Sequence, residues 1–361
     1  MTVHSNQRNA WRRLKRNKTA IAGMVVIIIA FLIAVFAYFI SPDSSPNANR
    51  MIVEIGGRKP GFKQQFILLG KEGAVGEESF PERLLYGKKD IYDYIPIEGY
   101  SWKSDSVVVN KYIDDGITER IAYPVPRFSG NEKHHIVVKK FLLGTDKYGR
   151  DILSRLIIGV RVSLAVGLVT VLLSLFIGVL LGSVAGYFRG RADDMIMWFI
   201  NVVWSIPTLL LVFAITLVLG KGFWQVFIAI GLTTWVNVAR LIRGQVLGIK
   251  EFEFVEAGRA LGFSSSRIIV RHILPNVMGP VIVIAASNFA TAIVIEAGLS
   301  FLGVGVQPPQ PSWGLMIKEN YNFIITQNPM LALAPGFAIM ILVLAFNMLG
   351  NGLRDALQVK A

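Results

Sequence analysis

Long apolar runs alternate with polar segments along this chain, and the length of the runs is the first structural clue. Each of six runs contains at most one charged residue and is long enough, as a helix, to cross a hydrocarbon core about 30 Å thick. The pattern predicts an all-α polytopic membrane protein with six transmembrane helices. Because the fourth run is near the lower length limit, four spans or a re-entrant segment remain as alternatives. The runs cover residues 21–40, 162–187, 195–219, 222–239, 276–298 and 330–349.

The segment between the first and second runs has a different composition. It carries charges of both signs, turn dipeptides, and short β-like stretches such as residues 106–109 and 136–138. We therefore expect a β-rich insert over residues 41–140. A basic head over residues 1–20 precedes the first run, and a core with the five further spans follows over residues 141–361.

The basic residues indicate which way the chain crosses the membrane. The formal charge of +13 would suggest a nucleic-acid partner in a water-soluble protein, but in a membrane protein the side that holds the charges matters more. With the N-terminus inside, the inner segments, among them the connection 240–275, hold sixteen Lys and Arg. The short outer connections hold only Lys221 and Lys318. We therefore expect cytoplasmic termini, an external insert, and lipid rather than nucleic acid around the chain.

Several kinds of chemistry are excluded by missing residues. The sequence has no Cys, so it has no disulfide, thiolate metal site or thiol nucleophile. It also lacks the glycine-rich loop that cradles nucleotide phosphates and the H-E-x-x-H and G-x-S-x-G patterns. His134 and His135 are the only His pair, and a solvated loop pair is favoured because adjacent side chains on a strand point apart. We expect no enzyme, no metal site and no cofactor in this chain.

The few polar side chains in the predicted spans are candidates for a translocation path. An ion-coupled transporter needs ionisable groups near the midplane, whereas Glu296 lies near the outer end of its run. It is either an interfacial carboxylate paired at a helix end or part of a gate. Pro207 permits a kink, and its polar neighbours serve either a path or interhelical hydrogen bonds. The path candidates are Asn201, Ser205, Pro207, Asn288 and Glu296.

Three glycines recur at four-residue spacing in the second run. Gly178, Gly182 and Gly186 share one helix face, where the missing side chains let another backbone approach closely. This spacing predicts a helix-packing surface.

The inner connection before the fifth run reads as helix, turn, helix. Residues 251–261 are helix-prone and acidic at their start, and Gly262 can supply a left-handed stop. Ser264 or Ser265 can cap a second helix, which we expect Pro275 to close before the next span. Helices this short cannot bury a core of their own, so the pair should dock either on a partner protein or on the lipid surface.

The residues of this hairpin resemble a known motif. Glu256-Ala257-Gly258, then Gly262, then Leu274-Pro275, resemble the EAA loop of ABC importer permeases. The resemblance implies that these residues couple the membrane subunit to a separate ATPase, with the loop's helices seated in a groove of the nucleotide-binding subunit.

Two further blocks resemble the C-type permease of peptide and nickel importers. The first is Leu143-Gly144-Thr145-Asp146 with Gly149-Arg150-Asp151 and Ser154-Arg155, and the second is residues 299–303 with Pro308, Pro309 and Trp313-Gly314. Both also have structural interpretations, since Arg150, Asp151 and Arg155 can pair and Trp313 suits the outer membrane interface.

The resemblance implies the type I permease fold of ABC importers. The chain would form half of a path for di- or oligopeptides with a second permease subunit. Two ATPase subunits would bind the ATP, and an external substrate-binding protein would deliver the substrate. Two other classes remain as alternatives: a membrane-anchored sensor whose insert binds ligand, and an autonomous ion-coupled transporter.

Overall fold

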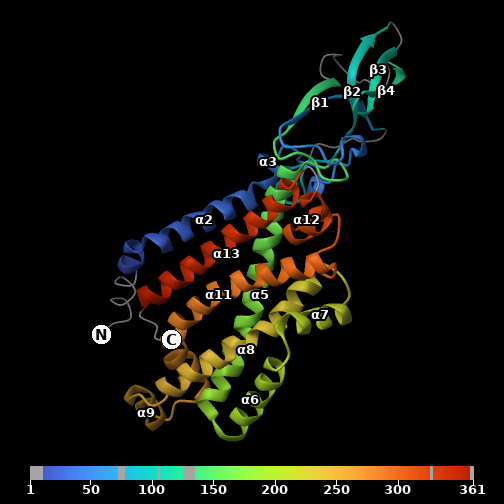
Figure 1. Ribbon diagram of the computed structural model, residues 1–361. Coiled ribbons are helices and arrows are strands. Elements are labelled where there is room, and N and C mark those ends of the chain that lie inside the picture. Colours follow the sequence, from blue (N-terminus) through green and yellow to red (C-terminus); the bar gives the residue numbers. More distant parts are fainter. Residues whose placement is uncertain (1–10, 72–77, 104–105, 125–134, 326–327, 358–361) are drawn as a thin grey trace. The chain divides into compact units, whose positions relative to one another are not determined.

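The computed structural model describes residues 11–71, 78–103, 106–124, 135–325 and 328–357 (Figure 1). The chain divides into two compact units. The first, here the helical unit, comprises Met1–Phe31, Ser163–Gln307 and Ile339–Ala361. The second, the insert unit, comprises Leu32–Val162 and Pro308–Ala338, so it combines the polar segment with a stretch near the C-terminus.

Helices dominate the chain, and five of those described are long and apolar enough to span a membrane. The first candidate is α2, and α10 continues through a π-helical turn into α11 as one long span. The helices are α2 (Lys18–Val35), α3 (Ala37–Ile40), α4 (Phe80–Tyr86), α5 (Ile152–Phe188), α6 (Gly190–Trp204), α7 (Thr208–Leu219), α8 (Phe223–Ile249), α9 (Glu253–Ala260), α10 (Ser265–Ile268), the π-helical turn Ile269–Ile273, α11 (Leu274–Leu302), α12 (Trp313–Asn320) and α13 (Met330–Leu357).

The length of the third apolar run had predicted one transmembrane helix, but the run does not form one straight helix. It is divided into α6 and α7, which are bent by 92° and give a sixth span only if the pair is counted as one. Pro207 has an extended ψ of 124° and is the N-cap residue of α7, where its carbonyl accepts from the Leu211 N–H. Proline disfavours helical geometry in the preceding residue, so Ile206 ends the helical path and the chain turns.

The helices of two other runs are about ten residues longer than predicted. The helix α5 begins at Ile152, ten residues before the apolar run, and α8 continues ten residues past Ala239 to Ile249. The first run breaks at Phe36 into α2 and α3. Helical hydrogen bonding continues into polar sequence, so apolar length measures membrane thickness rather than helix length.

In the helical unit, α5 and α8 approach each other at the three spaced glycines. A Cβ built on Gly178 would lie 2.5 Å from Cβ of Val238, and one on Gly186 would lie 2.8 Å from Cβ of Val246. At Gly182 an added Cβ would collide with the Ala239 carbonyl oxygen. Any larger residue at these positions would separate the two backbones.

The insert unit contains a five-stranded antiparallel sheet in the order β4-β3-β2-β1-β5 (Figure 1). One cluster of buried side chains includes Ile67, Ile97 and Val107, and a second includes Phe66 and Phe141. The neighbours Phe66 and Ile67 belong to different clusters because successive side chains of a strand point to opposite faces. The predicted β-rich insert is confirmed. The strands are β1 (Phe62–Gly70), β2 (Tyr92–Trp102), β3 (Ser106–Asp114), β4 (Ile117–Pro124) and β5 (Ile136–Phe141).

The prediction of a solvated His pair is wrong for His135. This side chain is buried, its Nδ1 lies 3.3 Å from the Leu68 carbonyl oxygen, and its ring meets Tyr92 edge-on. His134 lies outside the described residues. Among the described residues no three His, Asp or Glu side chains form a group that could hold a metal ion.

The turn that leads into α5 is held by a buried ion-pair cluster. Arg150 donates from Nε to Asp146 (2.6 Å) and from Nη2 to Glu319 (2.7 Å), and all three side chains are at most 10% exposed. Arg155 lies 3.9 Å from the same aspartate. The expected pairing of Asp151 with these arginines is wrong, because its Oδ2 accepts from the backbone N–H of Ser154 instead (2.9 Å).

Trp313, which we expected at the outer membrane interface, is covered by its own chain. Its side chain is buried within the insert unit, where the indole Nε1 donates to the Leu156 carbonyl (3.0 Å). A Cβ on Gly159 would lie 2.8 Å from the indole ring, so this glycine leaves the space that the ring fills.

Candidate functional site: the α9 hairpin and a cavity in the helical unit

The first helix of the hairpin ends in a Schellman motif built on Gly262. This residue has φ +76°, which confirms the predicted left-handed stop. The Phe263 N–H donates to the Gly258 carbonyl (3.1 Å), and the Gly262 N–H donates to the Arg259 carbonyl (2.9 Å). The two bonds satisfy carbonyls that the helix end would leave without partners.

The sequence had suggested that the second half of the hairpin ends at Pro275, but it does not. Ser264 caps α10, accepting from the Arg267 N–H (3.4 Å), and the chain then passes through Ile269–Ile273 into α11 without a break. In this π-helical turn the Leu274 N–H donates to the Ile269 carbonyl. Proline is tolerated in the first turn of a helix, so Pro275 lies at the start of α11.

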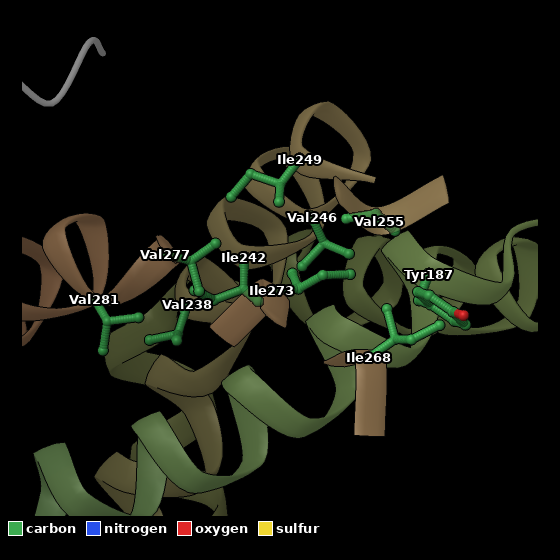
Figure 2. Packing of buried hydrophobic residues seen from close by; sticks show 10 residues of the cluster. All are labelled: Tyr187, Val238, Ile242, Val246, Ile249, Val255, Ile268, Ile273, Val277 and Val281. Atoms are coloured by element: carbon green, nitrogen blue, oxygen red, sulfur yellow. The ribbon is translucent and has the colours of Figure 1, made fainter. Parts of the chain in front are cut away.

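One face of the hairpin is anchored inside the helical unit. Figure 2 shows Val255 of α9, Ile268 of α10 and Ile273 gathered with side chains of α8, including Ile242 and Val246. Tyr187 at the end of α5 belongs to the same cluster. The helices thus bury their inner face against their own chain, and this contact fixes their position.

The exposed surface of the hairpin carries large apolar side chains among charged ones such as Glu256 and Arg267. Phe254, Leu261 and Val270 are 42%, 73% and 64% exposed, and Phe252 is exposed as well. Of the motif residues, Glu256, Ala257, Gly262 and Pro275 are exposed, Leu274 is half-buried and Gly258 is buried. An apolar surface of this kind is typical of a site that another protein covers.

Charged side chains tie the hairpin to the end of α5. Arg189 pairs with Glu251 at 2.7 Å, and Lys250 donates from Nζ to the Tyr187 carbonyl (2.6 Å). Burial, together with the positive charges of Arg189 and Arg259, lowers the pKa of Lys250. These contacts leave the apolar face of the hairpin free.

A cavity of about 430 Å³ lies between α7, α8 and α11 in the helical unit. The hydroxyls of Thr233 and Thr234 donate to the Ile230 carbonyl at 2.8 and 2.9 Å, and that of Thr291 donates to the Ser287 carbonyl at 3.0 Å. Each hydroxyl proton is thereby used, and the oxygens can accept hydrogen bonds from a molecule in the cavity. The polar lining residues are Thr208, Thr233, Thr234, Asn237 and Thr291, beside Trp204.

None of the five path candidates from the sequence lines this cavity. Asn201 lies near it on α6, where its Oδ1 accepts from Arg240 (2.8 Å), and the Arg240 guanidinium stacks 3.6 Å above the Trp204 ring. Ser205 and Pro207 form the corner between α6 and α7, and the Ser205 hydroxyl donates to the Val202 carbonyl.

The other two candidates are buried away from the cavity. Asn288 donates to the Ser174 hydroxyl of α5 at 3.4 Å. Glu296 is 1% exposed and accepts from Ser300 (2.6 Å), whose oxygen accepts from the Val306 N–H. This arrangement fits a carboxylate paired near a helix end, inside the helical unit.

Sequence reasoning missed the polar residues that do line the cavity. Thr233 and Asn237 are four residues apart and therefore share a helix face. That spacing was the available signal, but threonine in an apolar run is common because it can bond to its own helix. Arg240 had been counted only as an inner-side charge.

Comparison with known proteins agrees with this architecture. Residues 178–360, just over half of the chain, match the family described as binding-protein-dependent transport system inner membrane component. Residues 5–52 match the N-terminal TM domain of oligopeptide transport permease C. The chain belongs to this family of inner-membrane permease components, and it is a multi-pass membrane protein.

Curated relatives extend the match over nearly the whole chain. The dipeptide transport system permease protein DppC of Bacillus subtilis is 33% identical over 99% of this chain and 86% of its own length. The oligopeptide permease protein OppC of the same organism is 41% identical over 62% of this chain and 72% of its own. The glutathione permease protein GsiD of Pectobacterium atrosepticum is 41% identical over 60% of this chain and 72% of its own length.

Among solved structures, the chain is similar to a chain of the inward-facing MetNI methionine ABC transporter. The TM-score is 0.48, with 20% identity over 58% of this chain and 98% of that chain.

Proposed function

We propose that this chain is the permease subunit of an ATP-driven, binding-protein-dependent importer of di- or oligopeptides. The relatives that match it are named as dipeptide, oligopeptide and glutathione permeases, and all of these substrates are small peptides. An external substrate-binding protein delivers the peptide. The chain binds no ATP itself, because separate ATPase subunits bind and hydrolyse it.

The observation that carries this proposal is the division of the α9 hairpin into two faces. The inner face, with Val255 and Ile268, is fixed in the cluster that holds the ends of α5 and α8. The outer face exposes large apolar side chains, Phe254 and Leu261 among them, beside charged ones. Two ATPase subunits dock on such faces, one on each permease. Movement of the outer face then passes to the spans, since the inner face cannot slide without disturbing the cluster.

The cavity of the helical unit contributes half of the translocation path, and a second permease subunit completes it. Three threonine oxygens that can accept hydrogen bonds suit the N–H groups of a peptide backbone. The guanidinium of Arg240 lies beside the cavity wall on Trp204 and suits a peptide carboxylate. The candidates Asn201, Ser205 and Pro207 act by shaping this wall.

The orientation with both termini in the cytoplasm follows from the distribution of basic residues, and it puts the hairpin on the side where ATP is available. The lysines and arginines of residues 240–275 lie around that hairpin. The insert unit then lies outside, where a binding protein arrives.

The coupling role is tested by a charge on the exposed face. Leu261→Glu adds a charge to the apolar surface without touching the buried cluster. We expect recovery of the ATPase subunits in a mild-detergent pull-down, and peptide uptake, to fall at least about tenfold, which corresponds to a loss of about 1.4 kcal/mol. The matched control is Ile117→Glu, an exposed residue of the edge strand β4.

The outcome also decides between the function classes. If the pull-down with the wild-type chain recovers neither an ATPase subunit nor a second permease, the importer assignment is wrong. The result would then favour the membrane-anchored sensor. If this chain alone moves peptide in proteoliposomes, it is an autonomous transporter. Normal uptake by Leu261→Glu would remove the hairpin from the coupling mechanism.

A further inference from the structure

The insert unit holds a second cavity, of about 130 Å³, that none of the functions above uses. Its wall comes from three separate stretches: the residues after α3, strand β5, and the turn before α5. Five charged residues line it, together with the apolar side chains of Pro42, Ile52 and Phe141. The charged residues are Asp43, Arg50, Lys139, Lys140 and Asp151.

Arg50 is a fixed part of this wall. Its guanidinium donates twice to Asp90, from Nε at 3.0 Å and from Nη2 at 2.9 Å, and it lies 3.2 Å from Asp43. It also stacks 3.8 Å above the Tyr94 ring. With these partners Arg50 and the two aspartates satisfy one another, and a bound molecule has to find its partners elsewhere.

Asp151 presents a carboxylate oxygen that lacks a donor. Its Oδ2 accepts from Ser154, whereas Oδ1 has no hydrogen-bond partner among the described residues. The residue is 5% exposed and lines the cavity. Burial raises the pKa of this carboxyl group. Leaving a charged acceptor buried and unbonded is costly, so a donor in the cavity would stabilise it.

Lys139 presents an ammonium group that lacks a carboxylate partner. Its Nζ lies 4.3 Å from the centre of the Tyr94 ring, and within the described residues no carboxylate comes within 4.0 Å of it. Burial and the positive charge of Arg50 lower the pKa of this lysine to about 8. The ammonium therefore lacks the acceptor that would offset its burial.

We propose that this cavity binds a free amino acid with a small side chain, the α-ammonium against Asp151 Oδ1 and the α-carboxylate against Lys139 Nζ. The volume equals that of about four water molecules, which is room for the charged core of such a zwitterion. A simple cation would satisfy only Asp151 and a simple anion only Lys139. Ile52 and Phe141 give the rest of the molecule an apolar wall.

Titration calorimetry on the detergent-purified full chain at pH 7 tests this site, with glycine, methylamine and acetate as the probes. We expect glycine to bind in a one-to-one ratio and the two half-molecules to bind at least about tenfold more weakly, because each lacks one charge-assisted contact. No binding of glycine at millimolar concentration, or equal binding of all three probes, would show that the cavity holds only water and overturn the proposal.

Two substitutions with a control locate the binding. Asp151→Asn and Lys139→Met should each weaken glycine binding at least about tenfold. The control is Lys63→Met, an exposed lysine of β1 whose neighbour across the sheet is Lys140. Glycine binding that survives both substitutions would place the site elsewhere. Circular dichroism checks the fold of each variant, and the three-probe comparison on wild-type chain stands without them.

Discussion

Different groups stabilise the interior of the helical unit and the interior of the insert unit. In the helical unit, α5 meets α8 at Gly178, Gly182 and Gly186, where no side chain separates the backbones. In the insert unit, the turn before α5 is held by a buried cluster around Asp146 and Arg150. Between apolar helices, close contact of small residues allows tight packing. A buried charge is tolerated where an opposite charge pairs with it.

The largest expected effect tests the charged side of this comparison. Asp146→Asn removes one charge from the buried cluster and leaves Arg150 and Arg155 with Glu319 alone. We expect the free energy of unfolding to fall by about 3–5 kcal/mol, as when one partner of a buried ion pair is lost. A denaturant titration followed by circular dichroism measures it.

The control for this change is an exposed ion pair. Glu251→Gln removes the partner of Arg189, and both side chains are more than half exposed. We expect the free energy of unfolding to fall by at most about 1 kcal/mol, since exposed ion pairs contribute little to stability. Equal effects of the two substitutions would show that burial of the cluster is not what stabilises the insert unit.

A smaller effect is expected from enlarging the packing glycines. Gly182→Val places a side chain against the Ala239 carbonyl, and overpacking of this kind costs about 1–3 kcal/mol. Gly244→Val on α8 is the matched control, because nothing lies within 4 Å of a Cβ there. Thermal unfolding in detergent compares them. If Gly182→Val melts at the temperature of the control, close approach of the backbones does not hold the unit.

The third comparison uses two glycines with the same backbone conformation, one in each unit. Gly262 and Gly116 both have φ +76° and open space around them. Alanine at either position should lower the free energy of unfolding by about 1–2 kcal/mol, because left-handed geometry is strained for residues with a Cβ. Only Gly262→Ala should reduce peptide-stimulated ATP hydrolysis in the assembled transporter. A similar reduction by Gly116→Ala would show a general loss of stability instead.

The smallest expected effect concerns protonation in the insert unit. With its pKa lowered to about 8, the amine of Lys139 should be neutral in about one molecule in ten at pH 7, far more often than an ordinary lysine. Competitive acetylation across a pH range should give Lys139 an apparent pKa near 8. Because the folded pKa is below the unfolded one, Lys139 should favour the folded state increasingly as pH rises from about 8 towards 10.5. An apparent pKa of Lys139 near 10.5 would contradict the burial that lowers this pKa.

Much of the architecture could be predicted from local pattern. The apolar runs, the β-rich insert and the stop at Gly262 were predicted because each depends on residues close together in the chain. The errors concern residues whose environment comes from distant segments. His135 and Trp313 are buried by β1 and α5, and no pattern around either residue shows this. Pro275 was taken as a helix end, although a preceding π-helical turn lets the helix continue.

The sequence by itself determined that the chain has several apolar segments long enough to cross a membrane, that a β-rich segment follows the first of them, and that Gly262 ends the first helix of the hairpin. Length, period and turn residues are local properties. Only the tertiary structure decided the 92° bend between α6 and α7, the two faces of α9, and the residues around each cavity. One partner of Arg150, Glu319, is 169 positions away. Such contacts arise when distant segments pack together, and packing selects one arrangement among several that the local pattern allows.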